Sequence, residues 1–163
     1  MSMRDVRSQA GFTIVEAIVA AAICLGVVLG IAGAFSLTLR SSLGNSARLQ
    51  AAFLEEEGLE AARILRDSGW TSNIASHAAG TPFYLTFDGT TWKATTTNAY
   101  IGATFERTIV IDNIYRDGSK NIVQSGGTLD ANTKKVTVTV SYRQGSATTS
   151  RSLSTYLTNI FNN

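Results

Sequence analysis

Residues 11–39, with the sequence GFTIVEAIVAAAICLGVVLGIAGAFSLTL, decide how this chain is organised. No charged residue occurs between Ala17 and Leu39. As a helix these roughly 23 residues extend over about 35 Å, which exceeds the hydrocarbon core of a bilayer at about 30 Å. We therefore expect a helix that crosses a membrane once. A secretory signal peptide is the alternative, but its apolar core is usually only about 7 to 15 residues long.

Glu16 is the only acidic residue in this apolar stretch, and it lies near the start. A carboxylate in the hydrocarbon costs on the order of 3 kcal/mol on insertion scales, so we expect it to have a partner. If the chain were cut between Gly11 and Phe12, the new α-amino group would lie four residues before Glu16, about one helical turn away. That amine could neutralise Glu16 within one subunit or between neighbouring subunits.

At these residues the sequence resembles the type IV pilin and pseudopilin family. The similarity consists of a short basic leader with Arg4 and Arg7, Gly11 at the cleavage point, and the residues from Phe12 to Glu16 before a long apolar helix. The resemblance implies that a prepilin peptidase cleaves after Gly11 and N-methylates Phe12. Because one acid among so many apolar residues affects insertion little, we expect Glu16 to act in assembly. The rest of the chain matches the family only in its overall layout.

The composition agrees with a small membrane protein that carries one head domain. The chain has 163 residues and a formal net charge of +2, of which the leader supplies +1 because Arg4 and Arg7 outweigh Asp5. This balance gives no reason to expect nucleic acid as a partner. The single cysteine, Cys24, lies within the apolar stretch, so no disulfide can form within the chain.

Helical periodicity continues beyond the apolar stretch, although the composition becomes that of a soluble protein. Small and apolar residues recur at intervals of three and four at Leu43, Ala47, Ala51, Leu54, Gly58, Ala62 and Leu65. We expect the acidic run Glu55–Glu57 to form a solvated face; the alternative is contact with basic residues of neighbouring heads. The sequence predicts one long helix over 12–67, ended by Asp67 to Gly69, with Gly69 as a left-handed cap.

The remaining residues show the alternation of β-strands. A loop is expected from Thr71 to Pro82, because this segment is rich in small and polar residues and contains the only proline. A hairpin with a turn at Asp88 and Gly89 should follow, and further strands are predicted at 105–115, 121–124, 134–143 and 152–160. The expected fold is α+β, a long N-terminal helix packed on an antiparallel sheet. The expected divisions are a leader at 1–11, a transmembrane and assembly helix at 12–39, an amphipathic helix at 40–69 and a β-rich head at 70–163.

The sequence contains few residues that could perform chemistry. His77 is the only histidine, and we expect its side chain to be solvated in a polar loop. No zinc motif, nucleophile with a base or glycine-rich phosphate loop is found, so we expect neither an enzyme nor a cofactor. Asp112, Asp117, Asn121 and Asp130 are expected in turns, where they could either bind calcium or serve as ordinary turn residues.

These observations, with the family resemblance, lead us to expect a structural subunit or minor component of a type IV pilus-like filament. A type II secretion pseudopilin is the closest alternative, and a tip adhesin, a DNA-uptake pilin or a membrane-anchored domain that never assembles are further ones. The expected partners are a prepilin peptidase, other pilin subunits, inner-membrane assembly machinery and membrane lipid. The resemblance places the leader in the cytoplasm and the head outside, first as a single-pass protein of the inner membrane and then in the filament.

Overall fold

The computed structural model describes Gly11 and residues 13–163, and it has the expected α+β architecture. The chain divides into two compact units, residues 1–43 and residues 44–163. The second unit is the head. The predicted leader residues and Phe12 lie outside the described residues, so the predictions made for them stay predictions.

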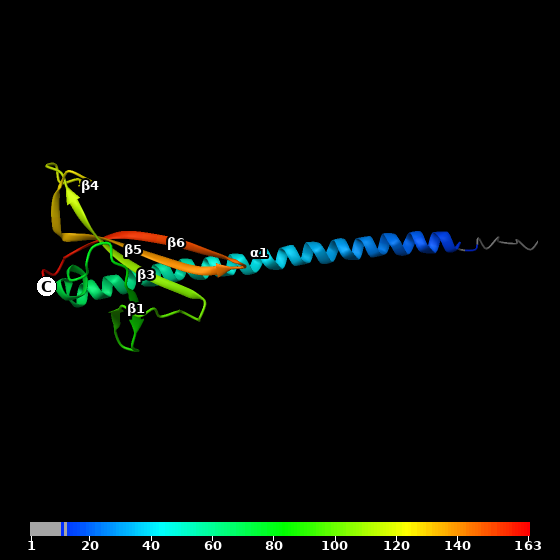
Figure 1. Ribbon diagram of the computed structural model, residues 1–163, viewed down its shortest axis with the longest axis horizontal. Coiled ribbons are helices and arrows are strands. Elements are labelled where there is room, and N and C mark those ends of the chain that lie inside the picture. The colour runs from blue at the N-terminus through cyan, green and yellow to red at the C-terminus, as the bar shows by residue number, and fades with distance from the viewer. Residues whose placement is uncertain (1–10, 12) are drawn as a thin grey trace, which may run out of the picture. The chain divides into compact units, whose positions relative to one another are not determined.

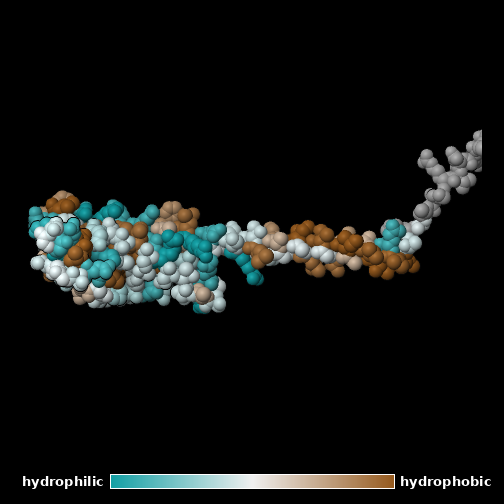
Figure 2. Space-filling model, turned by 90° about the horizontal axis from the view of Figure 1, so that it is seen from above, coloured by the Kyte–Doolittle hydropathy of each residue, from teal (hydrophilic) through white to brown (hydrophobic). Residues whose placement is uncertain are grey.

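Helix α1 (Ile14–Ser68) is coloured from blue to green in Figure 1. Its bounds agree with those of the predicted helix to within a residue or two at each end. Its N-terminal half is long and apolar enough to cross a membrane, and none of that segment is buried within the protein. Figure 2 shows this half mostly in brown, the colour of hydrophobic residues, with white residues of intermediate hydropathy among them. The amphipathic half, by contrast, buries one face in the head.

The segment that follows α1 is more ordered than the loop predicted for Thr71–Pro82. It begins with a short π-helix, η1 (Thr71–Ala75), and the side chains of Trp70 and Ile74 are buried in the core. The prediction of a surface loop was wrong for Thr71–Ala75, where the buried Ile74 was given too little weight, whereas residues 76–82 form neither helix nor strand and are largely exposed. Gly69 follows the helix directly. Its backbone is almost extended, with a φ of 159°, so this residue does not form the predicted left-handed cap.

The head contains two antiparallel sheets. The predicted hairpin is confirmed as β1 (Tyr84–Phe87) paired with β2 (Trp92–Thr95). The larger sheet has the order β4-β3-β5-β6. Its strands are β3 (Phe105–Arg116), β4 (Ile122–Val123), β5 (Thr128–Gln144) and β6 (Ala147–Thr158). The hairpin joins the larger sheet through a bridge between Phe83 and Ile109.

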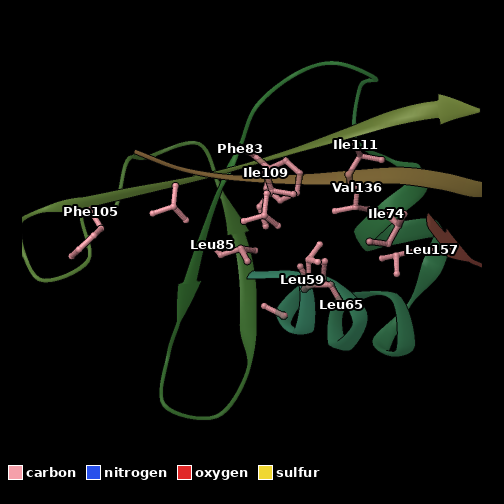
Figure 3. Packing of buried hydrophobic residues seen from close by; sticks show 14 of the residues in the cluster. Leu59, Leu65, Ile74, Phe83, Leu85, Phe105, Ile109, Ile111, Val136 and Leu157 are labelled. Carbon is pink, nitrogen blue, oxygen red and sulfur yellow. The ribbon is translucent and has the colours of Figure 1, made fainter. Parts of the chain in front are cut away.

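The core lies between the amphipathic half of α1 and one face of the larger sheet, as Figure 3 shows for labelled residues from both elements. The predicted alternation in β5 is confirmed. Four of its side chains point to the helix and are buried, namely Val136, Val138, Val140 and Tyr142. On α1 the predicted apolar face is buried from Ala51 to Leu65, except that Leu54 is only partly buried. Leu43 was assigned to this face wrongly, because it is 72% exposed while its neighbour Gly44 is buried.

Two glycines of α1 allow the helix to lie close to the sheet. A Cβ atom added at Gly58 would lie 2.8 Å from a methyl group of Val138, whereas at Gly44 it would meet only the end of the Gln144 side chain, at 2.6 Å. Val138 is fully buried and cannot move aside, but a flexible glutamine can. The helix therefore needs glycine at position 58 and merely tolerates it at position 44.

We expect Gly58→Ala to destabilise the head and Gly44→Ala to leave its stability unchanged or slightly higher. Alanine raises helix propensity by about 1 kcal/mol at either site, but overpacking against Val138 costs about 1 to 3 kcal/mol. Thermal unfolding of the full chain in detergent, followed by near-ultraviolet circular dichroism, checks this. Equal melting temperatures for the two variants would contradict the close approach at Gly58.

Candidate functional site

The described part of the N-terminal motif forms a helix cap. The side-chain oxygen Oγ1 of Thr13 accepts a hydrogen bond from the backbone N–H of Glu16 at 3.3 Å, and the Thr13 carbonyl accepts one from Ala17. Thr13 and Glu16 thus have the spacing of a capping box, in which a threonine and a glutamate three residues later satisfy free N–H groups of the first turn. Glu16 also lies in the first turn of α1, where the helix dipole favours a negative charge.

This contact uses the backbone N–H of Glu16 and not its carboxylate, so the role that it reveals is that of Thr13 as the helix cap, which sequence reasoning missed. The predicted cleavage between Gly11 and Phe12, the methylation of Phe12 and its pairing with Glu16 all involve Phe12, which lies outside the described residues. For the carboxylate of Glu16 the structure therefore adds only a favourable place in the first turn of α1, and its pairing with the Phe12 amine stays a prediction.

The acidic run on α1 is not the uniform solvated face that was predicted. Glu55 is 3% exposed, and its Oε2 atom lies 3.5 Å from Nε of Arg151 on β6. Its other oxygen, Oε1, has no hydrogen-bond partner in the part of the chain that the structure describes. The prediction was wrong for Glu55 because the helix position that faces β6 depends on how α1 lies on the sheet, which the acidic run itself does not reveal.

Arg107 is the second charged residue between the helix and the sheet. It points from β3 towards α1, is 4% exposed, and donates hydrogen bonds to Glu57 at 2.8 Å and to the Leu54 carbonyl at 3.3 Å. Its guanidinium group also lies over the Trp92 ring, 5.1 Å from the ring centre. Glu57 is therefore held within the chain, whereas Glu56 is exposed and forms no ion pair among the described residues.

Three of the four residues proposed as possible calcium ligands, Asp117, Asn121 and Asp130, form hydrogen bonds within the protein. The carboxylate of Asp117 accepts hydrogen bonds from the backbone of Asn121 and Ser119, and Asp130 pairs with Arg116 at 2.7 Å. The backbone hydrogen bond from Asn121 lowers the pKa of Asp117, and the hydrogen bond from Arg116 lowers that of Asp130.

Asp112 and Asp130 were predicted in turns, but both lie within strands: Asp112 is in β3 opposite Lys135, and Asp130 is in β5 opposite Ile114. Among residues 11 and 13–163 no group of three or more histidine, cysteine, aspartate or glutamate side chains is arranged to hold a metal. Of the three aspartates only Asp117 lies in a turn, which its own carboxylate stabilises.

His77 is not the solvated side chain that was predicted. Its ring stacks on Phe83 with 4.1 Å between ring centres and an angle of 10° between the planes. This partial burial lowers the pKa of His77 below its ordinary value of 6.5. The polar neighbours of His77 in the sequence gave no sign that the chain would turn it onto a strand residue.

Comparison of the chain with protein-family models, with characterised proteins and with solved structures finds no match. Any functional conclusion therefore depends on the chain's own residues and fold.

We expect the stability of the head to fall as the pH is lowered through about 6.5, partly because of His77. The unfolded chain takes up a proton near that pH, whereas the folded chain resists it until its lower pKa is reached, so protonation favours unfolding. Melting temperatures between about pH 7.5 and pH 5 measure the effect, since most carboxylates titrate below this window. His77→Phe keeps the ring stack and should reduce the pH dependence; an unchanged slope would contradict this origin.

Proposed function

We propose that this protein is a structural subunit or minor component of a type IV pilus-like filament. The observation that carries the proposal is the motif from Gly11 to Glu16, placed directly before an apolar helix that buries nothing within its own chain. The same helix α1 then continues into an α+β head. Such a helix needs an apolar environment from outside the chain, either a bilayer or neighbouring copies.

In this proposal the helix occupies the two environments in succession. The peptidase first removes the leader, and the subunit is then drawn from the bilayer into a bundle of apolar helices. Side chains such as Ile18, Leu29 and Phe35, each more than 60% exposed in the single chain, would be covered in both states. The heads would form the outer surface of the filament. The apolar segment, including Cys24, would lie inside it.

Glu16 would give each incoming subunit a register. In surroundings of low dielectric constant, its carboxylate and the α-amino group of a neighbour's Phe12 would attract each other far more strongly than in water. The competing explanation is local: the Glu16 charge stabilises the helix start through the helix dipole, beside the cap that Thr13 forms with the backbone, without selecting a partner. Both explanations can be separated experimentally.

A type II secretion pseudopilin is the alternative, since it would use the same N-terminal residues and the same helix. DNA uptake is less well supported. Of the basic residues on the head, Arg151 pairs with Glu55 and Lys134 is largely buried beside Asn113, so no continuous basic surface is formed by them.

Coexpression with a prepilin peptidase should shorten the protein by the leader and leave Phe12, methylated, as the first residue. A bulky residue at Gly11, for example Gly11→Leu, should block cleavage because the peptidase must accommodate the residue before the cut. Mass spectrometry of the N-terminus checks both results. An intact Met1 on the membrane-resident protein, with active peptidase present, would argue against the pilin assignment.

Glu16→Gln should insert into the membrane at the wild-type level but enter filaments poorly when mixed with wild-type subunits. Glutamine removes the charge while it can still take part in the helix cap, so this variant tests docking alone. Thr13→Val is the matched control, because it removes the cap and keeps the Glu16 charge. Membrane level and incorporation into sheared filaments are the measurements.

The two explanations predict opposite patterns for these variants. Poor incorporation of Glu16→Gln with normal incorporation of Thr13→Val supports docking by charge. The reverse pattern, or normal incorporation of both, would remove Glu16 from the assembly mechanism.

A further inference from the structure

A hollow in the head lies between strand β2 and the segment in which helix α1 ends and η1 follows. Figure 1 shows the hairpin, labelled β1, beside this end of α1. The hollow has a volume of about 600 Å³, within the range of about 300 to 1,000 Å³ that is common for small-molecule sites. Its lining combines the indole ring of Trp92 with neutral polar side chains, among them those of Ser68, Asn73, Ser76 and Thr91.

Trp92 is fixed beside this hollow by contacts within the chain. The guanidinium group of the buried Arg107 lies 5.1 Å from the centre of the Trp92 ring. Arg107 is itself hydrogen-bonded to Glu57 and to the Leu54 carbonyl, and the Phe87 ring packs against Trp92 with 5.2 Å between ring centres. An indole held in this way offers a flat apolar surface to a ligand, and little side-chain entropy is lost when the ligand stacks on it.

The polar side chains of the lining already donate hydrogen bonds within the chain. Oγ of Ser68 donates to the Leu65 carbonyl at 2.9 Å, and Oγ of Ser76 donates to the Ser72 carbonyl at 2.6 Å. The amide nitrogen of Asn73 donates to Oγ of Ser68 at 3.0 Å. A hydroxyl group has one hydrogen and two lone pairs, so each of these oxygens can still accept a hydrogen bond. The hollow therefore suits a ligand that is rich in O–H or N–H donors.

The charges around the hollow narrow the ligand class further. Lys93 is the only lysine or arginine among the described residues that line it, and its Nζ atom lies 2.6 Å from Oδ2 of Asp88. An anion, which offers only acceptors, would thus find few free donors. No aspartate or glutamate of the described chain lines the hollow, so a cation would have no counter-charge there. A purely apolar ligand would separate the hydroxyl oxygens from water without replacing their hydrogen bonds.

A second hollow, of about 440 Å³, adjoins the first. His77 and Ala94 line both, and Thr81 and Thr95 supply further hydroxyl groups to the second. The shared residues place the two hollows side by side, so a ligand longer than one ring can extend from one into the other.

We propose that the hollow beside Trp92 binds a neutral oligosaccharide of more than one pyranose unit. A pyranose ring has an apolar face of C–H groups, which stacks on the indole, and hydroxyl groups around its rim, which donate to oxygens such as those of Ser68 and Ser76. The next unit lies in the second hollow. The inference goes beyond the proposed filament function and does not depend on it, because both hollows are formed within the head alone.

Fluorine NMR of the full chain, labelled with 5-fluorotryptophan in a detergent without a sugar headgroup, tests the site. The chain has two tryptophans, so two signals are expected, and Trp92→Phe assigns them. Cellobiose, lactose, maltose and chitobiose are titrated separately at millimolar concentrations. We expect at least one of them to shift the Trp92 signal to saturation while the signal of the buried Trp70 stays in place. Sorbitol, which has hydroxyl groups but no ring face, should shift neither signal.

Two variants test whether the ligand occupies the hollow. Ala94→Tyr should weaken binding about tenfold or more, because the added ring fills the junction of the two hollows and tyrosine suits a strand. Thr86→Tyr is the matched control, since Thr86 is exposed on β1 and lines neither hollow, and it should bind as the parent does. Ser76→Ala should weaken binding about fivefold through the loss of one acceptor. Near-ultraviolet circular dichroism checks that each variant is folded.

The proposal is overturned if none of the four disaccharides shifts the Trp92 signal, or if sorbitol shifts it equally. It is also overturned if Ala94→Tyr and Thr86→Tyr, both folded, bind alike; should Ala94→Tyr not fold, unchanged binding by Ser76→Ala has the same meaning. These results are separable from those on the filament. Cleaved, filament-forming subunits that bind no disaccharide would contradict the sugar site alone, whereas an uncleaved chain that binds one would support the site and argue against the filament.

Discussion

The head depends on the contact between the amphipathic half of α1 and the inner face of the larger sheet. Gly58 allows the two elements to approach so closely that even a methyl group at this position would collide with Val138. The alternate residues of β5 and the small and apolar residues of α1 are buried together in this contact. Neither an isolated amphipathic helix nor a sheet with one uncovered apolar face would be stable in water, so each element stabilises the other.

Charged residues within the same contact restrict how the helix can lie. Arg107 reaches Glu57 and the Leu54 carbonyl, and Arg151 lies beside the buried Glu55. Moving the helix by one turn would leave buried charges without partners, which costs several kcal/mol. We attribute the alignment of α1 on the sheet to these pairs, and the area of the contact to the apolar residues. The alignment in turn decides which residues of α1 remain exposed.

The two halves of α1 meet different surroundings. The head half satisfies one face within the chain, whereas the N-terminal half satisfies none of its side chains there. Its backbone is nevertheless complete, because helical hydrogen bonds need no outside partner and Thr13 caps the first turn. A continuous helix can therefore pass from an apolar environment into water, provided that something outside the chain covers its apolar side chains.

Local patterns in the sequence were sufficient to predict the long helix, the hairpin, the principal strands and the inward face of β5. They repeat every 3.6 or 2 residues, so a short window contains the signal. Gly11 and Glu16 were also identified within a short window as candidate site residues, and their roles stay predictions. The burial of Glu55, the position of Arg107 over Trp92 and the stacking of His77 on Phe83 were not predictable in this way. Each joins segments far apart in the chain, and which segments meet is decided only when the helix packs on the sheet.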